Sequence, residues 1–263
     1  MYEDKELYLN EIKPGIFVID ENHESTGYLV VGEKKACLID TMLGYHDYRK
    51  LVEELTDKPY VVVNTHGHPD HIYGNFYFDE AYINPADKPV TEASLTDTRF
   101  TEILNEIGAK MPPFKDIKDG DVIELGGRTL EIYDLPGHTP GGIVLLLKED
   151  RILFAGDSIN HFLWLQVPHA LPLTQCAANI DKLLFLEEKA DVILHGHARD
   201  FDDIALMHHV RDGILEIIDG KTENDVPYEG FWGTAMQHFY EIKDGKHYQQ
   251  PMHAIVYFPD RVK

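Results

Sequence analysis

The chain has 263 residues, which is enough for one large α/β domain with a modest appendage. Its 46 acidic and 24 basic residues give a net charge of −22, which argues against nucleic acid and anionic membrane surfaces as partners, because both need a basic patch. Residues 1–13 lack the apolar core of a signal peptide, and no apolar run approaches the roughly 18 residues of a membrane helix.

The two cysteines, Cys37 and Cys176, are too few for a disulfide framework. We therefore expect reduced, structural thiols and a cytoplasmic protein. A single disulfide between them is the alternative that the count alone leaves open.

Strands followed by a helix are predicted for the first third of the chain. Short β-branched or aromatic runs between turn residues favour strands, and apolar residues at helical spacing favour a helix. The predicted strands are Gly15–Asp20, Gly27–Val31, Ala36–Asp40 and Tyr60–Asn64, and the predicted helix is Tyr45–Leu55.

The middle of the chain predicts a helix and then two β-hairpins. The helix is expected at Thr96–Ile107 with Thr96 as its N-cap, and Met111–Phe114 is expected to form a loop after it. Turn residues then separate two pairs of strand-like runs. The paired runs are Asp121–Leu125 with Arg128–Asp134, and Ile143–Leu147 with Arg151–Ala155.

The last third predicts helices around one further strand. The expected elements are a helix at Thr174–Glu188, a strand at Asp191–Leu194, a helix from Phe201 to Ile218, an aromatic-rich stretch at Tyr228–Glu241 and an edge strand at His253–Phe258. This order of elements suggests two sheets with helices outside them. We expect one domain over residues 1–263, in which about 201–263 form a C-terminal extension of helix and strand.

The strongest chemical signal is Thr65-His66-Gly67-His68-Pro69-Asp70-His71, directly after a predicted strand. Imidazole and carboxylate groups are ligands for zinc and related divalent ions. Residues two apart in an extended segment point to the same side, so His66 and His68 can bind one metal together. Pro69 is suited to begin a helix, whose first turn would direct Asp70 and His71 toward a second metal. A histidine-rich surface loop is the alternative.

Three further segments place possible metal ligands at the end of a predicted strand or in the loop that follows. His138 lies in a turn shaped by glycine and proline, and Asp157 comes just after a strand. His195 and His197 follow another strand. Each has an ordinary alternative when taken alone: a turn residue, a helix cap or a pair of surface histidines. Together with the first motif, they indicate a site for two metals.

The order of these motifs, HxHxDH, PGHTPGG, GDS and GH, resembles the metallo-β-lactamase superfamily. The resemblance spans roughly Gly15 to Ala198, and the HxHxDH block is highly specific. Leu38-Ile39-Asp40-Thr41 also looks like the first motif of the family, in which the aspartate supports the site. The resemblance implies an α/β fold, a four-layer αββα sandwich of the metallo-β-lactamase type, with the metals in a cleft at one edge.

Carried over position by position, the resemblance implies two metal sites joined by a carboxylate. The first site would use His66, His68 and His138, and the second would use Asp70, His71 and His197. Asp157 would bridge the two ions. His197 fits the family pattern because it follows Gly196, whereas His195 departs from the pattern and would be a supporting residue.

The expected cofactors are two divalent metal ions, with Zn²⁺ as the first expectation and Mn²⁺ or Fe²⁺ suited to the same ligands. Two such cations about 3.5–4 Å apart lower the pKa of a shared water toward neutrality, and the resulting hydroxide attacks a carbonyl carbon or a phosphorus. Asp70 would act as the catalytic residue that orients this hydroxide or takes its proton. Ser158 is expected to be structural, because the chemistry needs no nucleophilic serine.

Within the family, the pattern is similar to glyoxalase II and to lactonases. It differs from β-lactamases that use a cysteine ligand, because Cys176 is not at a motif position. The few basic residues after His197 weaken a glutathione thioester as the substrate. We therefore predict hydrolysis of a small ester, lactone or thioester, with a small molecule as partner and a homo-oligomer left open.

The loop after Asp157 is expected to shape the substrate pocket. The candidate contacts are Asn160, His161 and His169, together with Phe162, Trp164 and Trp232. Ordinary loop packing is the alternative for each of these side chains.

Three rival functions follow from the same residues. A mononuclear iron dioxygenase acting on glutathione persulfide has similar motifs, but the complete second ligand set argues against it. Phosphodiesterase or β-lactamase activity could use the same site. A non-catalytic binding protein of the same fold would be expected to lack ligands, and none is missing here.

Overall fold

The computed structural model describes residues 5–263, apart from the side chain of Arg99. Its first sheet has seven strands in the order of the sequence. They are β1 (Leu7–Lys13), β2 (Ile16–Glu21), β3 (Ser25–Val31), β4 (Ala36–Ile39), β5 (Tyr60–Val63), β6 (Ala81–Ile83) and β7 (Phe114–Asp116). The strands β1 to β4 are antiparallel, whereas β4 to β7 run parallel, so helical crossovers connect the latter.

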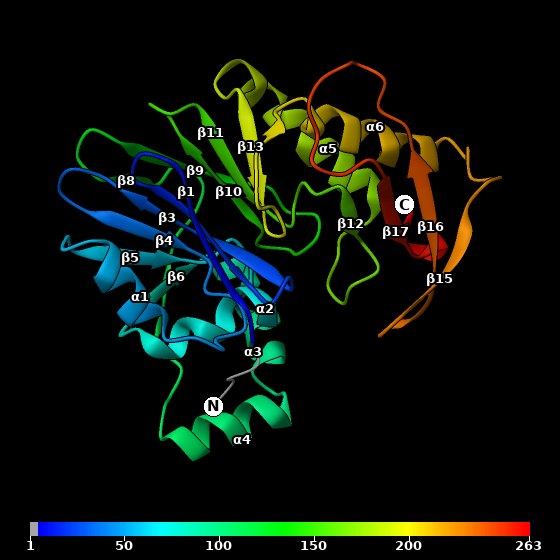
Figure 1. The fold of residues 1–263 in the computed structure, drawn as a ribbon. Coiled ribbons are helices and arrows are strands. Elements are labelled where there is room, and N and C mark those ends of the chain that lie inside the picture. The colour runs from blue at the N-terminus through cyan, green and yellow to red at the C-terminus, as the bar shows by residue number, and fades with distance from the viewer. Residues whose placement is uncertain (1–4) are drawn as a thin grey trace.

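Four α-helices provide these crossovers: α1 (Tyr48–Leu55), α2 (Pro69–Ile72), α3 (Lys88–Ser94) and α4 (Thr98–Ile107). Short 3₁₀ turns at Tyr73–Tyr77 and Pro85–Asp87 complete them. Tyr48 and Val52 of α1 pack against Leu29 and Leu38 on the outer face of the first sheet. The helices therefore form one outer layer, as Figure 1 shows.

The second sheet has six strands in the order β14-β13-β11-β10-β9-β8. They are β8 (Val122–Glu124), β9 (Thr129–Asp134), β10 (Ile143–Leu147), β11 (Ile152–Gly156), β13 (Val192–His195) and β14 (Asp202–Asp203). Two helices cover its outer face: α5 (Leu173–Leu183), which continues as a 3₁₀ turn at Leu184–Glu188, and α6 (Leu206–Ile218).

Besides the cluster beneath α1, two core layers flank the second sheet, one on each face. In β10, Leu145 and Leu147 pack against the first sheet, whereas Val144 and Leu146 pack against the helices. This strand is therefore buried on both faces, which explains its continuous apolar run. The layers confirm the predicted αββα sandwich.

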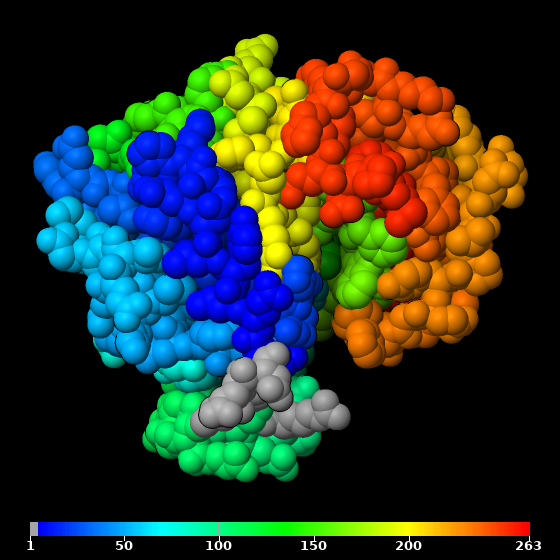
Figure 2. All heavy atoms as spheres, viewed as in Figure 1, coloured from blue at the N-terminus to red at the C-terminus, as the bar shows by residue number. Residues whose placement is uncertain are grey.

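A third sheet of four strands stands against α6, and the sequence patterns did not predict it. It consists of β12 (Phe162–Trp164), β17 (His253–Tyr257), β16 (Gly233–Tyr240) and β15 (Val226–Gly230), in this spatial order. A final 3₁₀ turn spans Pro259–Arg261. Gly213 lets α6 approach this sheet closely, because a Cβ there would lie 2.8 Å from Cδ1 of Tyr240. In Figure 2 this part of the chain, in orange, faces the blue N-terminal strands across a hollow.

Two predictions for the C-terminal region are wrong. The strand at His253–Phe258 is not an edge strand, because β17 lies between β12 and β16 and all five of its residues are buried. Its parallel partner β12 is only three residues long and distant in sequence, so no local pattern indicates the pairing. The helix does not begin at Phe201, because residues 202–203 pair with β13 as β14, and α6 begins at Leu206.

Smaller differences lie in the first half. The strands β1 and β6 were not predicted, and Phe114, which was expected in a loop, begins β7. The residue that caps α4 is Asp97 rather than Thr96: Oδ1 of Asp97 accepts the N–H of Phe100 at 3.1 Å. Short, half-exposed strands such as β7 lack the apolar alternation that marks a strand in sequence.

The two cysteines are both free and buried, as the reduced-thiol prediction requires. Within residues 5–263, no helix has the length and apolar character needed to cross a membrane.

Candidate metal centre

The histidine-rich segment adopts the local structure that its sequence predicts. The strand β5 ends at Val63, and the helix α2 begins with Pro69 at its first position. Asp70 and His71 therefore project from the first turn of a helix, whereas His66 and His68 precede it. The carboxyl ends of β4, β5, β11 and β13 meet at the same edge of the two sheets, and the site lies there (Figure 1).

Seven side chains from four segments converge at this edge. Three groups of three have one ligand atom per residue within 4.8 Å of one another: His66, His68 and His138; His66, His71 and Asp157; Asp70, His71 and His197. The structure thus brings together all seven residues proposed as ligands. Asp157 belongs to the second group and lies between the first and the third. Its Oδ2 is 3.1 Å from Nε2 of His197 and 3.7 Å from Nε2 of His138.

The donor atoms at the centre of this cluster fit a divalent cation. Nε2 of His66, Nε2 of His71 and Oδ1 of Asp157 are buried and have no hydrogen-bond partner among the described residues. Buried polar atoms are nearly always hydrogen-bonded, so three without a hydrogen bond at one point, two of which (Nε2 of His71 and Oδ1 of Asp157) face each other at 3.6 Å, fit a bound cation. Two imidazoles and a carboxylate are ligands that zinc, manganese and iron all accept.

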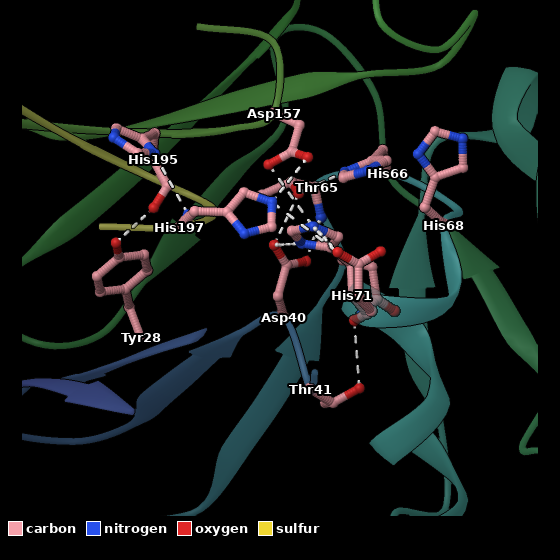
Figure 3. Close-up of polar contacts among 12 residues, drawn as sticks. Tyr28, Asp40, Thr41, Thr65, His66, His68, His71, Asp157, His195 and His197 are labelled. Carbon is pink, nitrogen blue, oxygen red and sulfur yellow. Dashed lines mark hydrogen bonds and ion pairs between the residues drawn. The ribbon is translucent and has the colours of Figure 1, made fainter. Parts of the chain in front are cut away.

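Asp40 holds two parts of the cluster in place. Its carboxylate accepts the N–H and the hydroxyl of Thr65, each at 2.7 Å, and lies 2.9 Å from Nδ1 of His71. Figure 3 shows the Asp40 carboxylate pointing up into the cluster, toward His71 and toward Thr65, which is drawn above it. This arrangement gives the first motif the supporting role that the sequence resemblance implies.

His138 is oriented by a backbone carbonyl. Its Nδ1 lies 2.7 Å from the carbonyl oxygen of Trp164, which can only accept, so Nδ1 carries the proton. Nε2 is then the unprotonated atom that could bind a metal, and here it accepts a hydrogen bond from Nδ1 of His68 at 2.9 Å. These two nitrogens therefore face the same position, as expected for ligands of one ion.

Burial and charge divide the histidines into two sets. Burial lowers the pKa of His66 and His138 and lowers that of His68 to about 3, so these three rings are neutral, as metal ligation requires. Burial also acts to lower the pKa values of His71 and His197, but nearby carboxylates outweigh it and raise both. The second set thus sits in the more negative half of the site.

Gly196 lets the backbone at the end of β13 pass close to the ligand cluster. A Cβ at Gly196 would lie 2.3 Å from Oδ1 of Asp157 and 2.6 Å from Cε1 of His71. Glycine is required here for space rather than for an unusual backbone conformation.

His195 and His197 point in different directions, as Figure 3 shows. His197 approaches Asp157 and Asp70, whereas Nε2 of His195 lies 3.5 Å from Asp202, away from the cluster. The carbonyl oxygen of His195 accepts the hydroxyl of the buried Tyr28 at 2.6 Å. His195 therefore occupies a supporting position.

A cavity of about 500 Å³ opens onto the cluster. Asn160 lines it, together with Phe162, Trp164 and Trp232, as predicted for the loop after Asp157. The other two predicted contacts, His161 and His169, are not among the residues that line this cavity. His161 is buried, with Nε2 2.9 Å from Asp202, and His169 is exposed at positive φ. Backbone alternation after Asn160 turns His161 to the opposite side.

Sequence reasoning missed Asp87, which joins the two ligand loops. Its buried carboxylate accepts N–H groups from Gly67 at 2.7 Å and Gly141 at 2.6 Å, and the hydroxyl of Thr139 at 2.9 Å. Asp87 thus fixes the loops that carry His68 and His138. It lies in a short 3₁₀ turn without a motif around it, so a single sequence gives no signal for this role. Ser158 is structural, since its hydroxyl donates to the carbonyl oxygen of Leu135.

Comparison with known proteins gives one family. The sequence profile of the metallo-beta-lactamase superfamily matches residues 23–197. The human acyl-coenzyme A thioesterase MBLAC2 is 29% identical over 177 residues, which cover 55% of this chain and 63% of that protein. A hydroxyacylglutathione hydrolase from Hyphomonas neptunium is 31% identical over 140 residues, covering 52% of this chain and 48% of that protein. The chain thus spans less than two thirds of the length of these relatives.

Solved structures show the same fold. The DIM-1 metallo-beta-lactamase exposed to ceftazidime aligns with a TM-score of 0.60 at 20% identity, covering 81% of this chain and 98% of that structure. A metallo-beta-lactamase from Pontibacter korlensis aligns with a TM-score of 0.55 at 21% identity, covering 80% of this chain and 99% of that structure.

Proposed function

The chain belongs to the metallo-β-lactamase superfamily, and on this premise we propose that it is a metal-dependent hydrolase that cleaves a small ester, lactone or thioester at a dinuclear metal centre. One observation carries the proposal: seven ligand side chains, three of them with unpaired buried donor atoms, converge where the 500 Å³ cavity opens. The similar relatives add support, since one is named as an acyl-coenzyme A thioesterase and the other as a hydroxyacylglutathione hydrolase.

The ligand groups suggest how two ions would be held. His66, His68 and His138 would bind the first ion, and Asp70, His71 and His197 the second, with Asp157 between them. When bound, such ions polarise a carbonyl group and make water more acidic. Zinc is the first expectation, and manganese or iron suits the same nitrogen and oxygen donors.

Asp70 and Asn160 have distinct parts in this proposal. Burial raises the pKa of Asp70, but His71 and His197 outweigh burial and lower it to about 2. Asp70 is therefore ionised near neutral pH, and its carboxylate would accept a hydrogen bond from the attacking water and orient it. Oδ1 of Asn160 accepts the N–H of Phe162 at 3.2 Å, which fixes the amide and leaves its NH₂ group for a substrate oxygen.

Elemental analysis joined to a substrate panel tests the proposal. Protein purified without chelators or a metal-binding tag should hold about two equivalents of divalent metal per chain. It should hydrolyse at least one member of a panel of neutral esters, lactones and thioesters, and chelation should abolish this activity reversibly. One equivalent of iron with persulfide oxidation would instead favour the dioxygenase. Metal-replete protein that hydrolyses nothing in the panel, phosphodiesters and β-lactams included, would contradict the proposal.

A further inference from the structure

An aromatic wall borders the cavity on the side of the third sheet. Phe162 and Trp164 come from β12, and Tyr228 and Trp232 come from the β15–β16 hairpin. The Trp164 ring lies 6.3 Å from that of Tyr228 and 6.4 Å from that of Trp232, centroid to centroid. Phe162 lies 5.9 Å from Tyr228. Phe162, Trp164 and Trp232 line the cavity beside the metal ligands, and Tyr228 extends this apolar surface toward the other side.

The tip of the hairpin completes this wall and lies beyond the part of the chain that matches the family, which ends at residue 197. Phe231 and Trp232 form the turn, with exposed fractions of 93% and 42%. Large exposed aromatic side chains next to a cavity are typical of a binding surface. The hairpin therefore adds a recognition element that the shared fold does not supply.

Outside the metal centre, the described lining of the cavity provides no cationic side chain for an anionic substrate group. Its described lining contains no lysine or arginine, and its one acid outside the ligand set is Glu24. The Glu24 carboxylate already accepts from Asn22 at 2.6 Å and pairs with Lys5 at 3.3 Å. Coenzyme A and glutathione carry phosphate or carboxylate groups, which need cationic partners on the protein. Nothing in the lining offers one to such a group.

A second cavity of about 200 Å³ lies behind the wall and shares Trp164, Phe231 and Trp232 with the first. Gln166 lines it and is only 1% exposed, yet neither atom of its amide has a hydrogen-bond partner among residues 5–263. Nε1 of Trp164 is likewise buried and unpaired. Unsatisfied buried amides and indoles are rare because they cost free energy. A ligand with a neutral polar group would satisfy them.

We propose that this aromatic subsite, formed by Trp164, Tyr228, Trp232 and Gln166 around the second cavity, binds an uncharged aromatic ring with a neutral hydrogen-bonding substituent, such as a phenolic hydroxyl. The rings of Trp164, Tyr228 and Trp232 pack against the apolar ring, and the amide of Gln166 meets its substituent. The ring would lie on one side of the scissile ester or thioester bond, so this inference rests on the proposed function for its catalytic part. Its binding part is independent of hydrolysis.

Ligand binding can be followed by tryptophan fluorescence, because Trp164 and Trp232 of the proposed subsite are the only two tryptophans of the sequence. Titration of the whole chain with para-ethylphenol should change the tryptophan emission, and calorimetry should give at least about tenfold tighter binding than for para-ethylbenzoate or ethylbenzene. Trp232→Ala should weaken the binding of para-ethylphenol by about tenfold or more. The matched control is Phe239→Ala, which removes an aromatic side chain of similar exposure, 45%, that lies on β16 away from both cavities.

Kinetics then test which side of the bond carries the ring. The measured quantity is kcat/KM for para-hydroxyphenethyl acetate and for methyl para-hydroxyphenylpropanoate, each relative to ethyl acetate. At least one ratio should reach about tenfold, and Trp232→Ala should reduce it. Gln166→Leu should remove the preference for the hydroxylated ring without lowering Tm, since its amide has no hydrogen-bond partner to lose among residues 5–263.

The outcomes separate the two proposals. The inference is wrong if the protein hydrolyses ethyl acetate but the aromatic ring does not raise kcat/KM, or if para-ethylbenzoate binds more tightly than para-ethylphenol. Either result leaves the proposed hydrolase function standing. Phenol binding that depends on Trp232 and Gln166, in a metal-replete protein that hydrolyses no ester, supports the subsite and contradicts the proposed function. If Trp232→Ala and Phe239→Ala weaken the binding of para-ethylphenol equally, Trp232 has no specific part in binding, and the proposed subsite is wrong.

Discussion

Nδ1 of His71 lies 2.9 Å from Oδ2 of Asp40, and neither side chain is more than 2% exposed. The carboxylate can only accept from the ring, so Nδ1 carries a proton and Nε2 is directed to Asp70 and Asp157, 3.5 and 3.6 Å away. The same carboxylate accepts both the N–H and the hydroxyl of Thr65, the residue before His66. Asp40 therefore sets the orientation of ligand positions on both sides of the site without lying in it.

Asp40→Asn should lower metal affinity about 10- to 100-fold without removing any ligand atom, because the amide disturbs the tautomer and position of His71. Competition with a chelator of known affinity measures this change. Asp47→Asn is the matched control, since Asp47 caps α1 at the surface, with Oδ1 3.0 Å from the N–H of Lys50. Unchanged metal affinity in Asp40→Asn would show that Thr65 alone positions the segment.

His195 and His197 should differ sharply on truncation. His197→Ala should lose about one metal equivalent and nearly all hydrolysis, because its Nε2 faces Asp157 and Asp70. His195→Ala should keep both ions and instead lower stability by about 1–3 kcal/mol, because its buried partner Asp202 loses a neighbour. Elemental analysis and thermal unfolding measure both effects. Loss of metal in His195→Ala alone would reverse the assignment within this pair.

Gly196→Ala should impair the site more than the fold. The new methyl group would lie 2.3 Å from Oδ1 of Asp157 and must displace the carboxylate. A displacement of about 1 Å at a catalytic group is enough to lower the rate about 100-fold. The control is Gly137→Ala, whose Cβ would meet Sγ of Cys176 at 3.4 Å, a tight but yielding contact. Wild-type kcat/KM in Gly196→Ala would mean that Asp157 tolerates a different position.

The αββα layers followed from the sequence because each strand carries its burial pattern locally. β10 is apolar throughout because both of its faces are covered, and β5 leads directly into the histidine-rich segment. The third sheet did not follow, because β12 has three residues and pairs with β17 some ninety positions later. Pairing between such short, distant strands leaves no periodic signal in either one.

The site residues likewise divide into those that a local sequence pattern predicts and those that only the fold brings together. His66, His68, Asp70 and His71 belong to one contiguous motif, and the structure gathers them with His138, Asp157 and His197 from three other segments. Asp87 was missed because its role depends on Gly67 and Gly141, which only the fold brings near it. His161 was misplaced because the direction of one side chain in a loop depends on the backbone there. The ligand assignments themselves stay predictions until metal is measured.

The buried histidine His253 predicts a loss of stability at acidic pH. Burial, together with the neighbouring His161, lowers its pKa to about 4 from an ordinary value of 6.5. Between these two values the unfolded chain binds a proton that the folded chain does not bind. Stability therefore falls as the pH decreases from 6.5 to 4, and this contribution is absent above 6.5. Since one pKa unit is about 1.4 kcal/mol and the ring is incompletely enclosed, we expect about 2 kcal/mol.

Thermal or urea unfolding of the metal-free protein at several pH values measures this contribution, because chelation removes the competing effect of metal on the other histidines. His253→Gln should be less stable than wild type at pH 7, where it loses the contact between Nδ1 of His253 and Nδ1 of His161 at 2.9 Å. Its stability should nevertheless decline less steeply toward pH 4. His23→Gln, at a largely exposed position, should keep the wild-type slope. Parallel slopes for all three proteins would mean that His253 takes up its proton in the folded state, and that the acid sensitivity of the fold resides in the histidines of the metal centre.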